Sequence, residues 1–327
     1  MSEKEIVLGF DIGGTKIVTG LISAAGELLG KRRIENKDTR PEDILPQMVR
    51  DAEELVRENG FEMKDVRGFG ISAPGPADIA NGILLAPTNN KLWKNVPILQ
   101  YLQEHLGVPG CFENDANCAA LAEGFFGAGR GIDDFIYLTM STGIGAGIVT
   151  GGTLVRGTGY FGGEAGHIVI DVHSDRVCGC GQKGCYEAYC GGRSVALYLQ
   201  KLLKDQPNHK IVECAGGKVE DIDMLALEKA YRAGDSLAAE IWDEMALRNA
   251  QAMGILINIF NPKRLILGTL AWAIGDLYTD PIRKYLPRFA WKEMLADCEL
   301  VNSELRRDVG SYAGAAAAMY FLLHKKF

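Results

Sequence analysis

The sequence predicts an α/β fold made of two copies of one unit, with a cleft between the copies. Each half opens with three apolar, β-branched runs joined by glycine turns. These predicted strands cover residues 6–10, 17–22 and 28–34 in the first half, and 135–140, 146–150 and 167–170 in the second. Two turn segments also resemble each other, Gly-Gly-Thr-Lys-Ile-Val-Thr from Gly13 and Gly-Ala-Gly-Ile-Val-Thr from Gly145. The shared order indicates an internal duplication.

The remaining predicted elements complete the two copies. Apolar residues of the segment 41–59 share one helical face, with Pro41 suited to the first turn and Gly60 to the stop. Further periodic runs predict strands at residues 66–71 and 264–267 and helices at 116–126, 236–260 and 313–323. We expect residues 1–117 plus 312–327 to form a small N-terminal lobe, and residues 118–311 to form a large C-terminal lobe.

Composition excludes several classes of protein. A formal charge of −7 argues against binding nucleic acid, which requires a basic surface. The chain shows neither a signal peptide nor an apolar run of membrane-spanning length, so we expect a cytoplasmic protein that is not bound to a membrane. Four of the eight cysteines crowd between Cys178 and Cys190, which indicates a metal site rather than disulfides.

Two glycine turns follow predicted strands. In Asp11-Ile-Gly-Gly-Thr-Lys16 the backbone N–H groups suit a phosphate and the Asp11 carboxylate suits Mg²⁺, although a plain hairpin turn remains an open alternative. The spacing does not fit a P-loop. The second turn, Ser141-Thr-Gly-Ile-Gly-Ala-Gly147, does not fit a dinucleotide site, because a strand and not a helix follows it. Two such turns are suited to grip one polyphosphate.

Asp115 lies between a short predicted strand and a predicted helix. Aspartate is a favoured helix N-cap, and the spacing alone favours that structural role slightly. The alternative is that the carboxylate, kept ionised by the helix terminus, accepts a hydroxyl proton during phosphoryl transfer.

One histidine and three cysteines have the composition of a structural zinc site. His167, Cys178, Cys180 and Cys185 are separated by ten, one and four residues. They supply the four donors of a tetrahedral Zn²⁺ ion, and the glycines at 179, 181 and 184 permit the tight turns. Four protein donors leave no open position for water, so a catalytic zinc is disfavoured.

Taken in order, the motifs resemble the ROK family (repressors, open reading frames and kinases), and within it the ATP-dependent glucokinases. They are Asp11-Ile-Gly-Gly-Thr-Lys16, Ser72-Ala-Pro-Gly-Pro76, Glu113-Asn-Asp-Ala-Asn117, Ser141-Thr-Gly-Ile-Gly145, Gly163-Glu-Ala-Gly-His167 and Cys178-Gly-Cys-Gly-Gln-Lys-Gly-Cys185-Tyr-Glu187. The resemblance implies an actin-like ATPase fold of two ribonuclease-H-like lobes with a central cleft. It also implies transfer of a phosphoryl group from ATP, with Mg²⁺, to the 6-hydroxyl of glucose, by a homodimer or homotetramer.

The resemblance also assigns roles by position. Asp115 becomes the catalytic base. The residues that resemble the sugar-binding set are Gly75, Asn90, Asn114, Asp115, Glu164, His167 and Glu187. Those that resemble the nucleotide-binding set are Asp11, Gly13, Gly14, Thr15, Lys16, Thr142, Gly143 and Gly268. His167 then serves twice, with one ring nitrogen on zinc and the other toward the sugar.

Three questions stay open at this stage. Where the family usually has a glycine-rich turn near the nucleoside, this chain reads Gly268-Thr-Leu-Ala271, which puts the preference for ATP in doubt. Kinases for N-acetylglucosamine, N-acetylmannosamine, fructose and allose share most of the motifs. The family also contains sugar-responsive repressors, but no basic helix-turn-helix extension precedes the first predicted strand.

Overall fold

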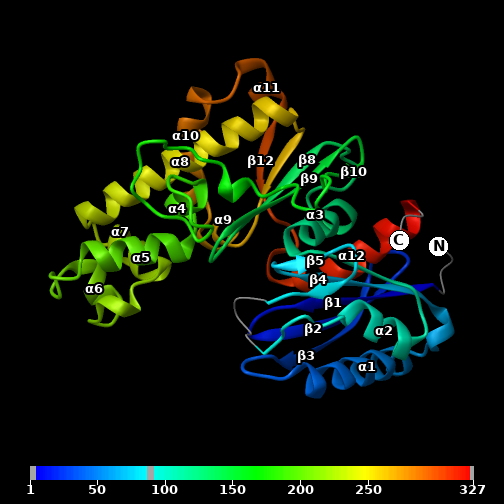
Figure 1. Cartoon of the computed structure of the whole chain (residues 1–327). Coiled ribbons are helices and arrows are strands. Elements are labelled where there is room, and N and C mark those ends of the chain that lie inside the picture. Colours follow the sequence, from blue (N-terminus) through cyan, green and yellow to red (C-terminus); the bar gives the residue numbers. More distant parts are fainter. Residues whose placement is uncertain (1–4, 87–91, 325–327) are drawn as a thin grey trace. The chain divides into compact units, whose positions relative to one another are not determined.

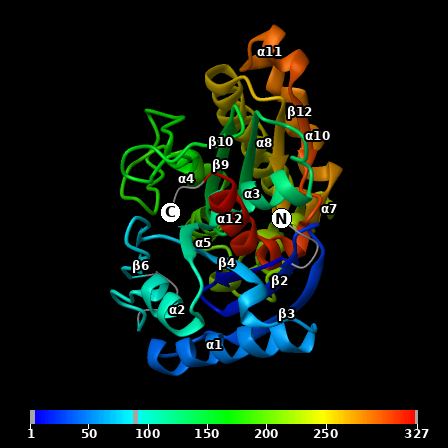
Figure 2. The same cartoon turned by 90° about the vertical axis from the view of Figure 1, so that its right-hand side faces the viewer.

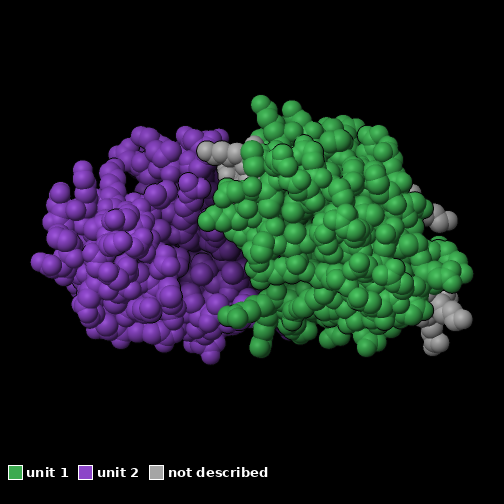
Figure 3. Space-filling view, turned by 90° about the horizontal axis from the view of Figure 1, so that it is seen from below, with its two compact units in different colours: residues 1–131, 154–162, 304–327 green, residues 132–153, 163–303 purple. Residues whose placement is uncertain are grey.

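The computed structural model describes residues 5–86 and 92–324 of the chain. The chain divides into two compact units, which Figure 3 distinguishes by colour. The first unit runs to Gly131, includes Leu154–Gly162 and resumes at Glu304. The second unit comprises Ile132–Thr153 and Gly163–Ser303. None of the helices in the described ranges combines the length and apolar content that a membrane crossing requires.

A five-stranded sheet forms the centre of the first unit (Figure 1). Its strands are β1 (Ile6–Ile12), β2 (Lys16–Ser23), β3 (Leu28–Glu35), β4 (Val66–Ala73) and β7 (Gly110–Asn114), in the order β3-β2-β1-β4-β7. β1, β2 and β3 form an antiparallel meander, and β4 and β7 run parallel to β1. A short separate hairpin consists of β5 (Ala77–Asp78) and β6 (Ile83–Leu84).

Successive side chains of β1 point to opposite faces of this sheet, and both faces are buried. Ile6, Leu8 and Phe10 belong to the larger core under helices α1 (Pro41–Glu58) and α2 (Ile98–Leu106). The intervening Val7 packs on the other face, which α12 (Val309–His324) and α3 (Asp115–Phe126) cover, as Figures 1 and 2 show. The first unit is therefore a three-layer sandwich of helices, sheet and helices.

Helix α12 lies so close to the sheet that only glycine fits between the two backbones. A Cβ atom on Gly70 of β4 would lie 2.0 Å from the carbonyl oxygen of Gly314, and one on Gly314 would lie 2.4 Å from the oxygen of Gly70. The buried run Ala315–Ala318 continues this contact. The small-residue composition that predicts the closing helix thus has a packing reason.

The second unit repeats the sheet. Its strands are β8 (Phe135–Met140), β9 (Ile144–Thr150), β10 (Thr153–Leu154), β11 (Arg264–Leu267) and β12 (Glu299–Asn302), in the order β10-β9-β8-β11-β12. β9 is antiparallel to β8, β11 is parallel to β8, and β12 is parallel to β11. The two sheets share one strand order, so the predicted duplication is confirmed.

The helices of the second unit are mostly inserted between β10 and β11. They are α4 (Tyr186–Cys190), α5 (Gly192–Leu202), α6 (Lys210–Cys214), α7 (Met224–Arg232) and α8 (Ser236–Phe260), followed after β11 by α9 (Leu270–Ile274), α10 (Asp276–Tyr285) and α11 (Lys292–Asp297). The long helix α8 begins after an aspartate N-cap, Asp235, whose side chain accepts a hydrogen bond from the N–H of Ala238. It ends at Asn261 in the left-handed conformation.

The strand predicted at residues 167–170 is wrong. The third strand of the second sheet is the short β10, and His167 instead ends a 3-10 turn, Ala165–His167. Beyond it, Ile170 N–H donates to the carbonyl oxygen of Gly184, and Ile168 accepts from the N–H of Tyr186. The segment pairs with the cysteine-rich loop rather than with the sheet, a long-range choice that alternation in the sequence does not reveal.

The unit boundaries also differ from the expected lobes. Residue 117 lies within α3, and the whole of α3 belongs to the first unit because it packs on α12. Glu123 of α3 is fully buried, and its carboxylate accepts hydrogen bonds from the N–H groups of Ala128 (2.7 Å) and Leu305 (3.3 Å). This carboxylate holds the start of the returning segment, which begins at Glu304, against α3.

Candidate active site and cysteine–histidine cluster

Three parallel strands of the first unit bring polar residues together at one edge of the sheet. Asp11 on β1 is in register with Ser72 on β4, and Ala73 is in register with Asn114 at the end of β7. The carboxyl ends of parallel strands meet at a common edge, where binding residues of α/β folds gather. The register therefore places Asp11, Ser72 and Asn114 close together, with Asp115 following directly.

The turn after β1 is a hairpin with a fixed backbone. Gly13 N–H donates to the carbonyl oxygen of Lys16 at 2.9 Å, and the side chain of the buried Asn36 donates to the carbonyl oxygen of Gly13 at 2.7 Å. Thr15 and Lys16 are exposed. The hairpin that the sequence left as an alternative is present, and it is compatible with binding a phosphate because its tip remains accessible.

Asp11 has an unusual electrostatic environment. The pKa of Asp11 is raised to about 6, mainly by burial and to a smaller extent by the nearby charge of Asp115. A hydrogen bond from Ser72 Oγ to Asp11 Oδ1, 2.8 Å long, and the charge of Lys16 act in the opposite direction. The charge of Asp115 opposes ionisation of Asp11, and a divalent cation bound beside these carboxylates would relieve that repulsion.

Asp115 is the first residue of α3, and Asn114 is the N-cap. Asn114 Oδ1 accepts the N–H of Ala116 at 2.9 Å, so the structural role that the spacing favoured for Asp115 belongs to its neighbour. One oxygen of Asp115 also accepts from Ala116 N–H, at 2.8 Å. Burial nevertheless raises the pKa of Asp115, because loss of solvent outweighs the stabilising backbone N–H groups. The helix terminus alone does not keep this group a strong acid.

An ion pair whose carboxylate is fully buried adjoins Asn114 and Asp115 in the chain. The carboxylate of Glu113 is fully buried and contacts Nε of Arg156 at 2.5 Å. Neither Glu113 nor Arg156 is among the residues that the sequence predicts for the site. The two residues are 43 positions apart, so no local spacing signals the pair.

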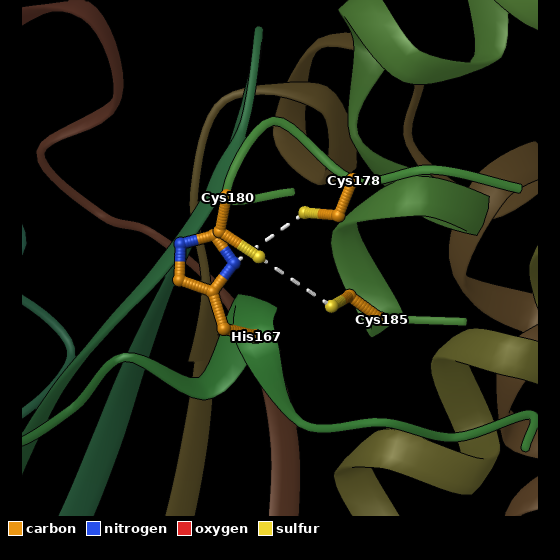
Figure 4. A group of neighbouring side chains, drawn as sticks. All are labelled: His167, Cys178, Cys180 and Cys185. Atoms are coloured by element: carbon orange, nitrogen blue, oxygen red, sulfur yellow. Dashed lines mark hydrogen bonds between the residues drawn. The ribbon is translucent and has the colours of Figure 1, made fainter. Parts of the chain in front are cut away.

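The predicted zinc ligands of the second unit come together in one cluster (Figure 4). His167, Cys178, Cys180 and Cys185 each offer a donor atom, and these four atoms lie within 4.8 Å of one another. Cys178 and Cys185 are buried, and Cys180 is exposed. The loop is closed by hydrogen bonds from Cys178 N–H to the oxygen of Gln182 (2.7 Å) and from Gly181 N–H to the oxygen of Cys178 (2.9 Å).

The spacing of these donors fits a tetrahedral ion. Bonds of about 2.3 Å to sulfur and about 2.0 Å to nitrogen put two sulfurs about 3.8 Å apart, and a sulfur and a nitrogen about 3.5 Å apart. Cys180 Sγ and Cys185 Sγ are separated by 3.8 Å, and Cys178 Sγ and His167 Nδ1 by 3.5 Å. The donor set and two of its edges thus match a structural zinc site.

Two carboxylates of the predicted sugar-binding set adjoin this cluster. His167 directs Nδ1 to the cysteines, and its Nε2 lies 3.8 Å from Glu164 Oε2. Glu187 Oε1 lies 3.6 Å from Cys178 Sγ, while its Oε2 accepts the N–H of Ile144 at 2.9 Å. The second unit therefore gathers Glu164, His167 and Glu187 around the cluster, and Glu187 also contacts the second glycine turn.

The second glycine turn, residues 141–143, packs on the start of α5. Arg193 N–H donates to the carbonyl oxygen of Thr142 at 3.0 Å, and Gly192 N–H donates to that of Ser141 at 2.8 Å. A Cβ atom on Gly143 would lie 2.5 Å from Glu187 Oε2, so a larger residue here would displace the Glu187 carboxylate. Glu187 thus supports the turn as well as the cluster.

Three further predicted residues have separate settings. Gly268 follows β11 and donates its N–H to the carbonyl oxygen of Leu138 at 2.8 Å. Thr269, next along the chain, has a φ of 30°, a conformation that favours glycine. Gly75 is exposed in the loop after β4, and Asn90 lies outside the described residues.

The sequence is similar to that of proteins with known roles. The model of the ROK family matches residues 7–320. The glucokinase of Thermotoga maritima is 34% identical over 312 residues, which cover 95% of this chain and 96% of that protein. The xylose repressor of Caldicellulosiruptor bescii is 29% identical over 302 residues, which cover 92% of this chain and 74% of the repressor.

Solved structures are similar over nearly the whole chain. A ROK hexokinase from Thermus thermophilus has a TM-score of 0.84 at 30% identity, with 98% of this chain and 100% of that chain covered. A ROK family glucokinase from Streptomyces griseus, solved in complex with glucose and AMPPNP, has a TM-score of 0.75 at 31% identity, with 96% and 98% covered. The expected actin-like ATPase fold is thereby confirmed for the chain.

Proposed function

The chain belongs to the ROK family and is an ATP-dependent hexose kinase, and we propose that it phosphorylates glucose at the 6-hydroxyl. The observation that supports this proposal is that Asp11 and Asp115, both half-buried, interact electrostatically beside the first glycine turn. Phosphoryl transfer needs a cation, oriented phosphates and a group that accepts the hydroxyl proton, and little covalent chemistry beyond these.

In this proposal the first unit supplies the proton acceptor and the cation site. Asp115 accepts the proton of the sugar hydroxyl as that oxygen attacks the γ-phosphorus atom of ATP, and ADP leaves. Asp11 carries the negative charge that suits Mg²⁺. The Gly13–Lys16 turn and the Thr142–Gly143 turn are assigned to the phosphates, and Gly268 to the nucleoside.

The hexose hydroxyls are assigned to a set of amide, imidazole and carboxylate groups. These groups belong to Asn114, Asp115, Glu164, His167 and Glu187. Such a set offers both donors and acceptors, which a ring with several hydroxyls requires. The position of His167 supports its double role, because Nδ1 faces the cysteines while Nε2 is near Glu164.

Zinc is assigned a structural role in the second unit. His167, Cys178, Cys180 and Cys185 would hold it, and the ion would fix the loop that carries them. Held in this way, His167 has one orientation of its ring, so that its second nitrogen is directed consistently. No step of the reaction involves the metal.

A coupled assay of ADP release tests the sugar assignment. The panel should contain glucose, mannose, fructose, allose, N-acetylglucosamine and N-acetylmannosamine, with ATP, GTP and polyphosphate as donors. We expect the highest kcat/KM for glucose with ATP. A higher kcat/KM for an N-acetylhexosamine would overturn the choice of glucose but would leave the kinase assignment intact.

The similarity to the xylose repressor favours a second candidate, a sugar-responsive regulator. A mobility-shift assay with promoter DNA at moderate salt addresses it. We expect no retarded species that responds to sugar, because the chain carries a formal charge of −7 and phosphate contacts need a basic surface. A sugar-dependent shift together with no turnover on any sugar would favour the regulator.

A further inference from the structure

We propose that Glu113 and Arg156 are positioning residues that fix Asp115 for catalysis. The proposal rests on the proposed function, in which Asp115 accepts the hydroxyl proton. Neither residue is assigned contact with substrate. Their role is to hold the first turn of α3 in a single arrangement through a buried network.

Glu113 holds the backbone on both sides of Asp115. Its Oε1 accepts the N–H of Asn114 at 2.9 Å and the Nδ2 of Asn117 at 3.0 Å. Asn114 precedes Asp115, and Asn117 follows it by two residues within α3. One carboxylate therefore brackets the residue that is to accept the proton, and the exposed fraction of Glu113 is 0%.

Arg156 holds Glu113 in turn. Its Nε donates to Glu113 Oε2, and its guanidinium lies 5.3 Å from the ring centroid of Tyr320 and 5.2 Å from that of Phe321. The hydroxyl of Tyr320 accepts the N–H of Leu154 at 3.0 Å, which anchors the same segment to α12. A planar guanidinium suits this stacked position, and a lysine ammonium would not reproduce it.

The network is not arranged for stability alone. Nη2 of Arg156 and Oδ1 of Asn117 are buried without a hydrogen-bond partner within the described part of the chain. Buried polar atoms usually have partners, and apolar residues of similar volume often replace buried ion pairs without loss of stability. A charged network that retains unpaired atoms directly behind Asp115 points to a role in orientation.

The location of Arg156 in the chain explains why only the fold reveals this role. Arg156 belongs to Leu154–Gly162, a segment of the first unit whose neighbours in sequence on both sides belong to the second unit. The segment is closed on itself, since Gly162 N–H donates to the carbonyl oxygen of Arg156 at 2.8 Å. It returns directly to the Gly163–His167 motif.

A methionine substitution of Arg156 tests the proposal against a matched control. The control is Arg248→Met, because Arg248 has a similar setting. It contacts Asp171 at 2.8 Å, and its guanidinium lies 4.6 Å from the ring centroid of Tyr189. The side chain of Arg248 is 21% exposed, and that of Arg156 is 19% exposed. We expect Arg156→Met to lower kcat about 10- to 100-fold, with KM for glucose and ATP changed less than about threefold. Arg248→Met should leave kcat within about twofold of wild type.

The decisive measurement repeats Arg156→Met in an Asp115→Asn background. A residue that acts only through Asp115 has no further effect once the carboxylate is absent, so the residual turnover should change by less than about twofold. An equal loss of kcat in both backgrounds would show a general structural effect and overturn the proposal.

A neutral double variant covers the case in which Arg156→Met folds poorly. Glu113→Gln combined with Arg156→Met removes both charges and keeps an amide oxygen toward Asn114 and Asn117. We expect a melting temperature nearer to that of wild type than Arg156→Met shows, with kcat still reduced at least tenfold. A wild-type kcat in this variant would refute positioning. Normal turnover in Asp115→Asn would instead refute the proposed base, and a wild-type chain inactive on every sugar would refute both.

Discussion

The first hairpins of the two units have the same backbone plan and different chemistry. In each unit the first two strands are antiparallel and joined by three residues, 13–15 between β1 and β2 and 141–143 between β8 and β9. The residue before the last in β1 is Asp11, and its counterpart in β8 is Thr139. In the second unit a carboxylate reaches the turn from elsewhere, since Glu187 accepts the N–H of Ile144.

This difference separates the duties of the two units. The first unit places Asp11 and Asp115 where burial raises the pKa of both, which suits a cation and a proton acceptor. The second unit has instead a cysteine–histidine cluster beside Glu164 and Glu187. A shared strand order therefore fixes where functional residues stand, and the side chains decide what each position does.

The largest expected effect is that of Asp115→Asn in the first unit. An amide cannot accept the hydroxyl proton, so we expect kcat to fall about 10³-fold, while the fold remains because the amide oxygen still accepts from Ala116 N–H. Steady-state kinetics and circular dichroism measure the two outcomes. Asp134→Asn in the second unit is the control and should leave kcat unchanged, because this carboxylate accepts hydrogen bonds from Thr150 Oγ and Gly151 N–H at the far end of β9. Near-normal turnover in Asp115→Asn would show that the first unit does not supply the proton acceptor through Asp115.

The second prediction concerns the cysteine–histidine cluster of the second unit. Cys180→Ser replaces one thiolate donor, and we expect zinc affinity to fall about 10- to 100-fold or more. Metal analysis after dialysis gives the readout, and KM for glucose should rise because His167 loses its fixed orientation. Cys214→Ser, outside the cluster, should retain about one zinc per chain. Equal zinc content in the two variants would show that Cys180 is not a zinc ligand.

The third prediction is a pH dependence that belongs to the first unit alone. With a pKa of about 6, Asp11 is protonated below that pH and becomes a poor cation ligand, so kcat/KM should fall about tenfold per pH unit below pH 6 at limiting Mg²⁺. Higher Mg²⁺ should move the midpoint to lower pH, because the metal competes with the proton. Asp11→Thr, which gives the first hairpin the residue of the second, should abolish the dependence of this limb on Mg²⁺ concentration.

The raised pKa of Asp11 also affects folding stability. Protonation of Asp11 lowers activity but stabilises the folded protein. A carboxyl group whose folded pKa is raised stabilises the protein when it is protonated, and this contribution is lost as pH rises from about 4 through about 6. Asp11→Asn should therefore raise the melting temperature at pH 7 relative to wild type while it lowers activity. An unchanged melting temperature would show that Asp11 is not destabilised by its surroundings.

The smallest expected effect concerns Thr269 in the second unit. Its φ of 30° is a strained conformation for threonine, with a cost of about 1–3 kcal/mol, and glycine relieves this strain at an entropic cost of about 0.5–1 kcal/mol. Thr269→Gly should thus raise the free energy of unfolding by about 1 kcal/mol in urea titrations. Thr153→Gly, in the extended strand β10, is the control and should lower it. A loss of stability in Thr269→Gly would mean that the threonine conformation is not strained.

Much of the fold is predictable from local sequence, and some of it is not. Strand β8, helix α8 and strand β11 have the predicted bounds, because each is a continuous apolar or periodic run with clear end signals. The third strand of the second sheet was misplaced, since the segment 167–170 forms its hydrogen bonds with the cysteine-rich loop. Backbone pairing between distant segments produces no periodic pattern of apolar residues in the sequence.

The candidate site divides in the same way. The four donors of the cluster were predicted from residue type and spacing, because a short loop brings them together by its own turns. The sequence favoured Asp115 as the N-cap of α3, but the N-cap is Asn114. Asn and Asp both suit this position, and only the backbone geometry distinguishes the two residues.

The sequence by itself determined the opening hairpin of each unit, the glycine turns and the donor set of the cysteine–histidine cluster, all of which depend on residues close together in the chain. Only the tertiary structure decided which carboxylates have raised pKa values and which residue supports Asp115 from behind. The physical reason is that burial and ion pairing depend on neighbours brought together by packing. Asp11 and Asp115 share one environment across 104 positions of sequence, and Glu113 meets Arg156 across 43.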